Sequence, residues 1–500
     1  MFDKILIANR GEIAVRVIRA CQEMGVRTVA VYSDADRLSP HVLIAGEAVA
    51  IGPSPASESY LRSEVIVRAA LETGAQAIHP GYGFMAESPA FARSVAEAGL
   101  VFVGPSPEAI AEMGDKTAAR ARMIEAGVPV IPGSEAIHSV EQGEREGDRI
   151  GWPVLLKAAA GGGGKGMRVI DSAADLPRAL TAASREAGQA FGDSRVYLEK
   201  YLADPRHIEI QVLADAHGRV IHLGERECSI QRRHQKLIEE SPSPAVDADL
   251  RRRMGDVAVA ATEAVEYVGA GTVEFLYQGG EFYFLEMNTR IQVEHPVTEF
   301  VTGVDLVREQ IRVAAGLPLS VETRADWPVG HSIECRISGE DPFNSFLPSS
   351  GRVQALEVPC GPGVRWDGGI IEHSEVGLHY DPLLGKLIVH APTRDQAILR
   401  MRRALRELQI EGIRTTQPFH LAVLDESDFK AGNISVRYVD RHPELLEVAE
   451  DDWHAWAASV AATLLEHRAR NGGPVLVPGH RLEDRGAEIS EWRRQFRSIE

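Results

Sequence analysis

Two glutamates and an asparagine in the run GTVEFLYQGGEFYFLEMN, residues 271–288, have the types and spacing of a metal site. The aromatic and β-branched runs on either side of QGGE predict an antiparallel hairpin. A two-residue turn at the glycine pair would send Glu274 and Glu286 to opposite faces, whereas a three-residue loop would pair them directly, with Asn288 beside them. We favour the three-residue loop, because glycine supplies the positive-φ residue that such a loop needs. Mg²⁺ bound with a nucleotide phosphate would then resolve the repulsion of the opposed carboxylates. The alternative is that one carboxylate points to solvent.

Three polar residues continue from this hairpin with period two: Arg290, Gln292 and Glu294. In an extended chain they project to the same side as the two carboxylates. A guanidinium and a carboxamide form a fork for a small planar oxyanion, and Glu294 would lie where it can take a proton from that anion. A solvated strand edge is the alternative for any one of these residues, but a series that continues the metal face favours a site.

Two polar runs lie upstream of the hairpin. A strand over RHIEIQVLAD would place His207, Glu209 and Gln211 on one face and aliphatic residues on the other. The simplest interpretation of that strand is a solvated polar face. The second run, GERECSIQRRHQKLIEE, contains Gln231, His234 and Lys236. Charge runs usually lie at the surface, but in an acidic chain this local concentration of basic residues predicts a place where an anion is held.

The glycine run KAAAGGGGKGMRVI, residues 157–170, nearly matches two nucleotide-binding loops and fits neither. A Walker A loop needs Ser or Thr after the lysine, where this chain has Gly166, and a glycine where it has Ala159. The G-x-G-x-x-G pattern does match, but it should lie between a strand and a helix, and here short strands precede and follow it. We therefore predict a glycine-rich hairpin. From the loop alone, phosphate binding and a plain flexible hairpin are equally open.

The composition describes an ordinary globular chain. Its 500 residues are 44% hydrophobic and 25% charged, which suits about three domains. The net charge of −18 argues against nucleic acid as a partner. We find no signal-like segment and no apolar run of about 18 residues, so we expect neither secretion nor membrane insertion. The four cysteines lack metal-ligand spacing, which favours reduced thiols in a cytoplasmic protein.

Four regions follow one another along the chain. Residues 1–113 alternate short aliphatic strands with amphipathic helices, which predicts a parallel sheet covered on both faces. Residues 114–330 hold the glycine run within a subdomain at about 131–203, and then polar-alternating strands that suggest an antiparallel sheet. Residues 331–446 predict a further α+β unit, and residues 447–500 a helix followed by a charged tail.

Nine motifs, in order over residues 4–440, are similar to those of the biotin carboxylases of the ATP-grasp superfamily: KILIANRGEIAVRVIRA, IHPGYGFMAES, GDKTAAR, KAAAGGGGKGMRV, EKYLADPRHIEIQV, ERECSIQRRHQK, FLEMNTRIQVEHPVTE, ECRISGEDP and HYDPLLGKLI. The resemblance implies a multidomain α/β and α+β fold. Its parts would be a Rossmann-like domain at 1–113, an ATP-grasp domain at 114–330 with a mobile lid at 131–203, a C-terminal domain at 331–446 and a helical tail at 447–500. The implied enzyme is a ligase that uses ATP and bicarbonate to carboxylate biotin through carboxyphosphate.

The same resemblance implies roles for individual residues. Those expected near ATP are Lys116, Lys157, Gly163, Gly164, Glu199, Lys200, Leu202, His207, Gln231, His234 and Glu274. Those expected to hold Mg²⁺, or Mn²⁺ in its place, are Glu274, Glu286 and Asn288. Those expected at bicarbonate are Lys236, Arg290, Gln292 and the backbone of Val293, with Glu294 as the base. Arg336 is expected to steady the biotin ureido oxygen, and Tyr82 and Gly83 to wall the biotin pocket or merely to form a turn. The residues expected to be catalytic are Arg290, Glu294, Arg336 and Lys236.

Partners are implied by a departure from the family. Complete carboxylases carry a biotinylated lysine after methionine, and none of the nine methionines here is followed by lysine. We therefore expect a separate biotin carboxyl carrier protein, a carboxyltransferase and a homodimer, as in an acetyl-CoA or other acyl-CoA carboxylase of fatty acid biosynthesis. The alternatives are the biotin carboxylase part of a pyruvate carboxylase, another ATP-grasp carboxylate ligase and a catalytically silent scaffold protein. The tail 447–500 lies beyond the resemblance and either caps the last domain or docks a partner.

Overall fold

The computed structural model describes residues 1–500 apart from 159–166, 192, 325–326, 448–458 and 467–500. The chain divides into two compact units, Met1–Leu446 and Glu447–Glu500. In the second unit, residues 459–466 are helical, which agrees with the helix expected in the tail. The rest of that expected helix lies outside the described residues. All elements considered below belong to the first unit.

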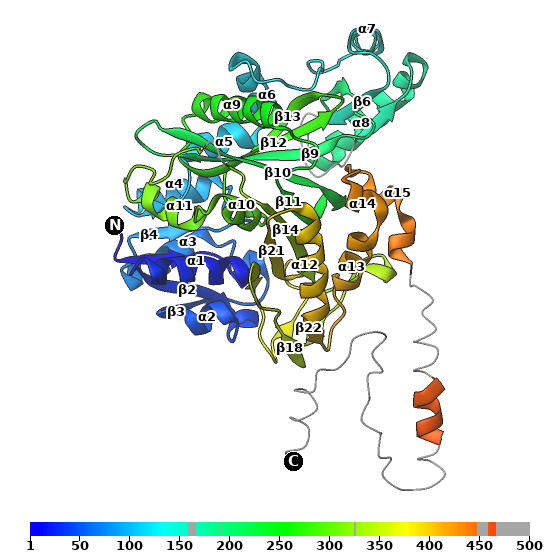
Figure 1. The fold of residues 1–500 in the computed structure, drawn as a ribbon. Coiled ribbons are helices and arrows are strands. Elements are labelled where there is room, and N and C mark those ends of the chain that lie inside the picture. Colours follow the sequence, from blue (N-terminus) through cyan, green and yellow to red (C-terminus); the bar gives the residue numbers. More distant parts are fainter. Residues whose placement is uncertain (159–166, 192, 325–326, 448–458, 467–500) are drawn as a thin grey trace, which may run out of the picture. The chain divides into compact units, whose positions relative to one another are not determined.

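The N-terminal region is a five-stranded parallel sheet of order β3-β2-β1-β4-β5 (Figure 1). Its elements are β1 (Lys4–Ile7), α1 (Gly11–Glu23), β2 (Arg27–Ser33), α2 (Pro40–Ile44), β3 (Glu47–Gly52), α3 (Ser63–Thr73), β4 (Ala77–His79), α4 (Pro89–Glu97), β5 (Val101–Phe102) and α5 (Pro107–Gly114). Side chains alternate along β1, so Ile5 packs in the core that contains α1, while Leu6 packs in the core that contains α3 and α4. The predicted parallel sheet, covered on both faces, is confirmed.

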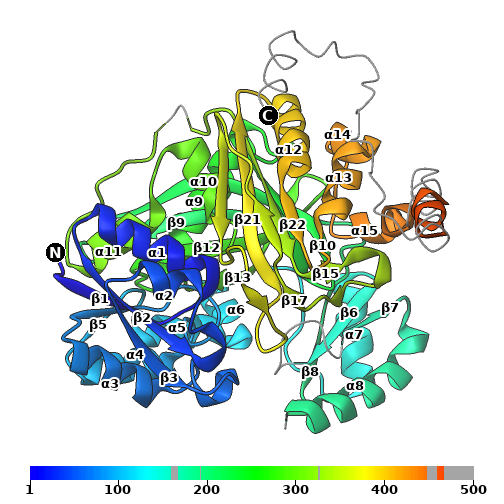
Figure 2. The same cartoon turned by 90° about the horizontal axis from the view of Figure 1, so that it is seen from below.

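A small antiparallel sheet of order β7-β6-β8 forms a lobe with two helices (Figure 2). The elements of the lobe are α7 (Val140–Ile150), β6 (Val154–Ala158), β7 (Arg168–Ile170), α8 (Leu176–Phe191) and β8 (Val196–Lys200), while the preceding helix α6 (Lys116–Glu125) packs in the core that contains α9. The lobe has its own core, in which Leu156 and Leu198 meet Leu176. Strands β6 and β7 flank the glycine run as the sequence predicted, while residues 159–166 lie outside the described residues.

The largest sheet has eight strands in the order β13-β12-β9-β10-β11-β14-β21-β19, and its neighbours are all antiparallel. Its strands and the helices that follow them are β9 (Arg206–Ala214), β10 (Val220–Arg232), β11 (Gln235–Ser241), α9 (Ala248–Ala264), β12 (Gly269–Gln278), β13 (Glu281–Asn288), α10 (His295–Thr302), α11 (Leu306–Ala314), β14 (His331–Ser338), β19 (Val364–Gly368), β21 (Leu383–Ala391) and α12 (Arg394–Glu407). Because β11 pairs with β14, the sheet runs without a break across the boundary at residue 330.

Helices cover this sheet at both ends (Figure 1). Residues of α9 share a core with β9 and β12, and residues of α12 share a core with β11, β14 and β21. The shorter elements of the C-terminal region are β15 (Glu340–Asp341), β16 (Leu347–Pro348), β17 (Gly351–Arg352), β18 (Ala355–Glu357), β20 (Glu375–Val376), β22 (Gln409–Glu411), α13 (Gln417–Asp425), α14 (Ser427–Ala431) and α15 (Tyr438–Arg441). Single 3-10 turns lie at Asp34–Asp36, Ala56–Glu58, Ala173–Asp175, Pro342–Asn344 and Pro443–Leu446.

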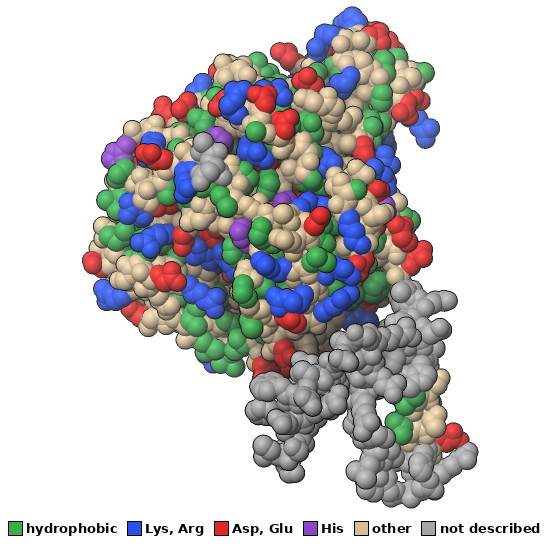
Figure 3. All heavy atoms as spheres, in the orientation of Figure 1, with side chains coloured by type: hydrophobic (Ala, Val, Ile, Leu, Met, Phe, Trp, Pro, Cys, Tyr) green, Lys and Arg blue, Asp and Glu red, His purple; other side chains and the backbone are tan. Residues whose placement is uncertain are grey.

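The surface is mixed in charge. On the face that Figure 3 shows, Lys and Arg side chains lie among Asp and Glu side chains. Among the described residues, the longest apolar helices fall short of what a membrane crossing requires.

Candidate active site

A cavity of about 1160 Å³ opens where the lobe, the large sheet and the loops that follow β1 and β4 come together. A smaller cavity of about 270 Å³ adjoins it and shares lining residues, among them Lys116, Lys157 and Glu286. A volume of this size suits two substrates rather than one, since most small-molecule sites measure about 300–1,000 Å³.

The hairpin β12–β13 pairs Glu274 directly with Glu286, as predicted, but by a different route. The turn has two residues, since Gln278 pairs with Glu281, so the favoured three-residue loop is wrong. A bulge restores the pairing, because the register shifts between Glu274 and Phe275, and Leu285 is the extra residue on β13. The two carboxylates therefore lie on one face of the sheet.

The two paired glutamates differ in environment. Glu274 is buried, and its Oε1 accepts hydrogen bonds from Asn288 Nδ2 at 2.8 Å, Gln292 Nε2 at 2.8 Å and Lys236 Nζ at 3.0 Å. Burial alone would raise the pKa of Glu274, but Lys236 and His207 outweigh burial and hold it well below its ordinary value. Glu286 is 40% exposed and lies 3.4 Å from Lys116 Nζ.

This donor set fits a divalent cation. Two carboxylates and the Asn288 carboxamide share one face of the hairpin and line the cavity, and hard oxygen ligands of this kind suit Mg²⁺. A second group of ligand atoms, from His207, Glu209 and Glu274, lies within 4.8 Å. Lys236 Nζ already contacts Glu209 at 2.5 Å and Glu274 at 3.0 Å, so that group carries its own cation.

Lys236 and Arg336 hold Glu294 between them. Lys236 Nζ lies 2.6 Å from Glu294 Oε1, and Arg336 Nη2 lies 2.8 Å from Glu294 Oε2. Burial alone would raise the pKa of Glu294, but these two cations and Arg226 hold it well below its ordinary value. The carboxylate is therefore ionised and can accept a proton. Arg336 Nε also donates to Glu239 Oε1 at 2.5 Å.

The segment that follows β13 is not extended, so the period-two prediction for it is wrong. Strand β13 ends at Asn288, and Glu294 is the N-cap of α10, which begins at His295 with Pro296 in its first turn. Proline favours the first turn of a helix and so ends the extended chain here. Arg290, Gln292 and Glu294 nevertheless all line the larger cavity. Arg290 Nε donates to Glu87 Oε2 at 3.0 Å.

The polar face of β9 is buried rather than solvated. His207, Glu209 and Gln211 each have less than a tenth of their surface exposed, so the simplest sequence interpretation is wrong. His207 Nε2 lies 3.0 Å from Glu274 Oε2. Gln231 and His234, from the basic run, line the larger cavity as well.

The residues expected near ATP divide between the two cavities. Lys157 on β6 forms an ion pair with Glu199 on β8, and both line the smaller cavity. Leu202 lines the larger cavity. Lys200 is exposed and lines neither cavity, because side chains alternate along β8 and Glu199 takes the inward position. Gly163 and Gly164 lie outside the described residues.

Tyr82 and Gly83 line the larger cavity on the side of the N-terminal region. The Tyr82 hydroxyl donates to Glu12, and Glu12 Oε1 lies 3.1 Å from Lys386 Nζ. Lys386 in turn donates to the Val293 carbonyl at 2.6 Å. A buried chain of contacts thus joins the expected biotin wall to the expected bicarbonate backbone.

Sequence reasoning missed the residues that support the site from behind: Glu12, Arg226, Glu239 and Lys386. All four are buried, and each contacts an expected site residue or that residue's direct partner. The available signal was a polar residue within an otherwise aliphatic segment, on a strand for Arg226, Glu239 and Lys386 and on helix α1 for Glu12. That signal does not say which strands become neighbours.

Comparison with known proteins gives a consistent picture. Three family models match in order: the biotin carboxylase N-terminal domain at residues 1–110, the carbamoyl-phosphate synthase L chain ATP-binding domain at 115–322 and the biotin carboxylase C-terminal domain at 334–441. The biotin carboxylase of Nostoc sp. is 54% identical over 440 residues, which cover 88% of this chain and 98% of that protein. A subunit of the pyruvate carboxylase from Methanothermobacter thermautotrophicus is 50% identical, with 90% of this chain and 93% of that protein covered.

Comparison with solved structures points to the same family. The biotin carboxylase domain dimer of the Hydrogenobacter thermophilus 2-oxoglutarate carboxylase, in complex with MgADP, ADP and bicarbonate, is 48% identical. It superposes with a TM-score of 0.83 over 90% of this chain and 100% of that one. The expected architecture, a three-domain biotin carboxylase fold built around an ATP-grasp, is confirmed. With these matches over nearly the whole length of its relatives, the chain belongs to the biotin carboxylase family of ATP-grasp ligases.

Proposed function

We propose that the chain uses ATP and bicarbonate to carboxylate biotin that is attached to a separate carrier protein. One observation supports this above all: an ionised base, Glu294, lies in one cavity with the paired carboxylates Glu274 and Glu286 and with the cations Lys236 and Arg336. A metal–nucleotide site and an anion site are thereby adjacent. Transfer of a phosphoryl group to bicarbonate needs that adjacency.

In this proposal the nucleotide is held by cations at the smaller cavity. Lys116 and Lys157 meet its phosphates, and Glu199, Leu202, His207, Gln231 and His234 surround the rest. Glu274, Glu286 and Asn288 hold Mg²⁺, which when bound supplies positive charge to the transferring phosphoryl group. Lys116 lies 3.4 Å from Glu286 in the resting site, so a metal bound to Glu286 would release this lysine toward phosphate.

Bicarbonate binds at Lys236, Arg290, Gln292 and the Val293 backbone. Its oxygen attacks the γ-phosphorus of ATP, which gives carboxyphosphate and ADP, and Glu294 takes the bicarbonate proton. An anion that draws Lys236 away from Glu294 raises the pKa of Glu294, so substrate binding itself makes this carboxylate a better base.

Carboxyphosphate then breaks into CO₂ and phosphate within the closed site. The phosphate removes the N1′ proton of biotin, the N1′ lone pair attacks CO₂, and Arg336 stabilises the negative charge on the ureido oxygen. Closing the lobe of residues 131–203 would exclude water, which otherwise hydrolyses the intermediate. Tyr82 and Gly83 would wall the biotin pocket.

We propose the acyl-CoA carboxylase as the setting, with a biotin carboxyl carrier protein, a carboxyltransferase and a second copy of this chain as partners in the cytoplasm. The division into domains at 1–113, 114–330 and 331–446, with the tail 447–500, belongs to the same proposal. The similarity to part of a pyruvate carboxylase supports a second setting with identical chemistry in this chain.

The proposal is tested by measuring bicarbonate-dependent ADP release with and without free biotin. We expect biotin to stimulate release. Arg336→Ala should lose that stimulation and keep ATP binding, because Arg336 acts on biotin rather than on phosphate. Arg403→Ala is the matched control, since Arg403 lies on the exposed face of α12 and, among the described residues, pairs only locally with Glu407 and the Cys360 carbonyl. Wild-type release without biotin stimulation would contradict the proposal.

A further inference from the structure

We propose that Arg226 is a positioning residue for the bicarbonate site, acting through Gln292 and through Glu209 on Lys236. This inference rests on the proposed function and adds a residue to it. Arg226 is fully buried on β10 and lines neither cavity, so it does not touch substrate.

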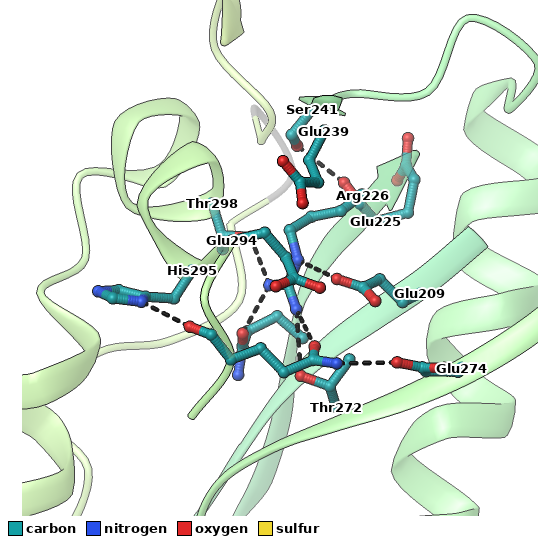
Figure 4. Close-up of polar contacts among 12 residues, drawn as sticks. Glu209, Glu225, Arg226, Glu239, Ser241, Thr272, Glu274, Glu294, His295 and Thr298 are labelled. Carbon is teal, nitrogen blue, oxygen red and sulfur yellow. Dashed lines mark hydrogen bonds and ion pairs between the residues drawn. The ribbon is translucent and has the colours of Figure 1, made fainter. Parts of the chain in front are cut away.

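The guanidinium of Arg226 uses all five of its N–H donors (Figure 4). Its contacts are Nε to Glu209 Oε1 at 2.5 Å, Nη1 to Gln211 Oε1 at 2.6 Å and to Thr298 Oγ1 at 3.0 Å, and Nη2 to Thr272 Oγ1 at 3.1 Å and to Gln292 Oε1 at 2.7 Å. These acceptors come from β9, β12, α10 and the segment that precedes α10. A rigid planar fork held from four directions has one orientation only.

That orientation decides how Gln292 faces the cavity. An arginine can only donate, so the atom of Gln292 that meets Arg226 must be the carbonyl oxygen. The amide nitrogen then points the other way, where it donates to Glu274 Oε1 at 2.8 Å. Arg226 thus presents the donor end of Gln292 to the side where an anion would bind.

The same guanidinium also sets the place of Lys236. Glu209 gives one oxygen to Arg226 Nε and the other to Lys236 Nζ at 2.5 Å. Lys236 is shared among Glu209, Glu274 and Glu294. Glu209 thus bridges the two cations. Because the guanidinium fixes this carboxylate, it also fixes the oxygen that holds Lys236 beside Glu274 and Glu294.

A merely structural role for Arg226 predicts something different. A buried arginine that only supported the fold would, when altered, lower stability and the amount of active enzyme, with the KM values for bicarbonate and ATP unchanged. A positioning role predicts a selective rise in the KM for bicarbonate. The two roles are therefore separable by steady-state kinetics.

The test uses the full chain and two variants that weaken the guanidinium contacts. Arg226→Lys keeps the charge but has three donors for five acceptors, and Thr298→Val removes one acceptor and keeps the shape. We expect the KM for bicarbonate to rise about tenfold or more for Arg226→Lys and about threefold for Thr298→Val, with the KM for ATP within about twofold of wild type. Thr302→Val is the matched control, since Thr302 lies one turn further on α10 and, within the described part of the chain, its hydroxyl contacts only the Thr298 carbonyl and the Val304 amide.

A double-mutant cycle with Gln292→Ala makes the test sharper. If Arg226 acts largely through Gln292, then Arg226→Lys in the Gln292→Ala background raises the KM for bicarbonate by less than it does alone. Multiplicative effects, or equal changes in both KM values, would overturn the inference. If Arg226→Lys does not fold, the test is the KM for bicarbonate of Thr298→Val compared with that of Thr302→Val. A rise in Thr298→Val alone supports the inference, and equal values overturn it. Wild-type enzyme whose ADP release does not depend on bicarbonate would overturn the proposed function, and the inference with it.

Discussion

Lys236 is the residue on which the charge balance of the site depends. Its ammonium lies within 3.0 Å of carboxylate oxygens from Glu209, Glu274 and Glu294. Burial alone would lower the pKa of Lys236, but these three carboxylates raise it well above its ordinary value. The lysine therefore stays charged, and it keeps Glu274 and Glu294 ionised in return.

Replacing this lysine should inactivate the enzyme and alter its pH profile. In Lys236→Met, only Arg336 and Arg226 would still oppose burial, so the pKa of Glu294 should rise and this base should become protonated at higher pH than in the wild type. We expect the kcat/KM for bicarbonate to fall at least about 100-fold and the acidic limb of its pH profile to move to higher pH.

Rates of bicarbonate-dependent ADP release between pH 6 and 9 would measure both effects. Lys430→Met is the control, because Lys430 is exposed on α14 and its ammonium contacts only Asp425 among the described residues. Activity within tenfold of wild type would show that Lys236 is not central to the site.

The sequence identified individual site residues better than it identified the side chains that contact them. The sequence predicts that Arg290, Gln292 and Glu294 form one series of site residues, and all three line one cavity. Arg226 was not recognised, because a period-two pattern shows which face a side chain takes and not which charges from other strands meet it. A buried charge is explained only by its partners, and those partners are set by the tertiary fold.

Strands β11 and β14 bring two buried carboxylates together. Glu239 and Glu334 are directly paired across these strands. Burial raises the pKa of Glu239 to about 7, although Arg336 opposes this effect. Burial also raises the pKa of Glu334 well above its ordinary value, and Lys386 only partly offsets it. Neither carboxylate oxygen of Glu334 has a hydrogen-bond partner among the described residues.

Two acids with raised pKa values make the fold less stable as pH rises. Each binds its proton more tightly in the folded chain than in the unfolded chain, whose glutamates titrate near 4.5. The unfolded state thus binds fewer protons, and stability falls from about pH 4.5 upward, through about pH 7 for Glu239.

Glu334→Gln should flatten this dependence, because the amide keeps the shape and cannot ionise. We expect the free energy of unfolding to fall less between pH 5 and 8, with a difference in slope of up to about 1.4 kcal/mol per pH unit over the range where the pair titrates. Urea unfolding at a series of pH values would measure the slope. Glu357→Gln, at an exposed position on β18, is the control, and parallel curves for wild type and Glu334→Gln would contradict the assignment.

The β12–β13 hairpin shows where prediction of elements reached its limit. Alternation of aromatic and β-branched residues located both strands, and the chemistry of opposed carboxylates selected the right pair. The turn length was wrong, because a bulge has the same effect on register as one more loop residue. Sequence pattern alone does not distinguish the two.

Across the whole first unit, local sequence patterns predicted the separate regions but did not predict the pairing of β11 with β14 that joins two of them. The parallel sheet of residues 1–113 follows from neighbouring elements in the sequence, and it is present as expected. The eight-stranded sheet crosses the boundary at 330 because β11 pairs with β14, about 90 residues further along the chain. Apolar alternation shows that a strand has a buried face and leaves its partner open.

Lys386 joins the parts of this unit and allows that connection to be tested. It is fully buried on β21 and contacts Glu12 on α1 at 3.1 Å and the Val293 carbonyl at 2.6 Å. Lys386→Met would leave Glu12 as a buried carboxylate without a nearby cation among the described residues, at a cost of about 3–5 kcal/mol in the free energy of unfolding. Adding Glu12→Gln removes that charge, so the double variant should recover much of the loss. Urea unfolding of the two single variants and the double variant measures the coupling, and additive losses would show that the contact between Lys386 and Glu12 does not hold these parts together.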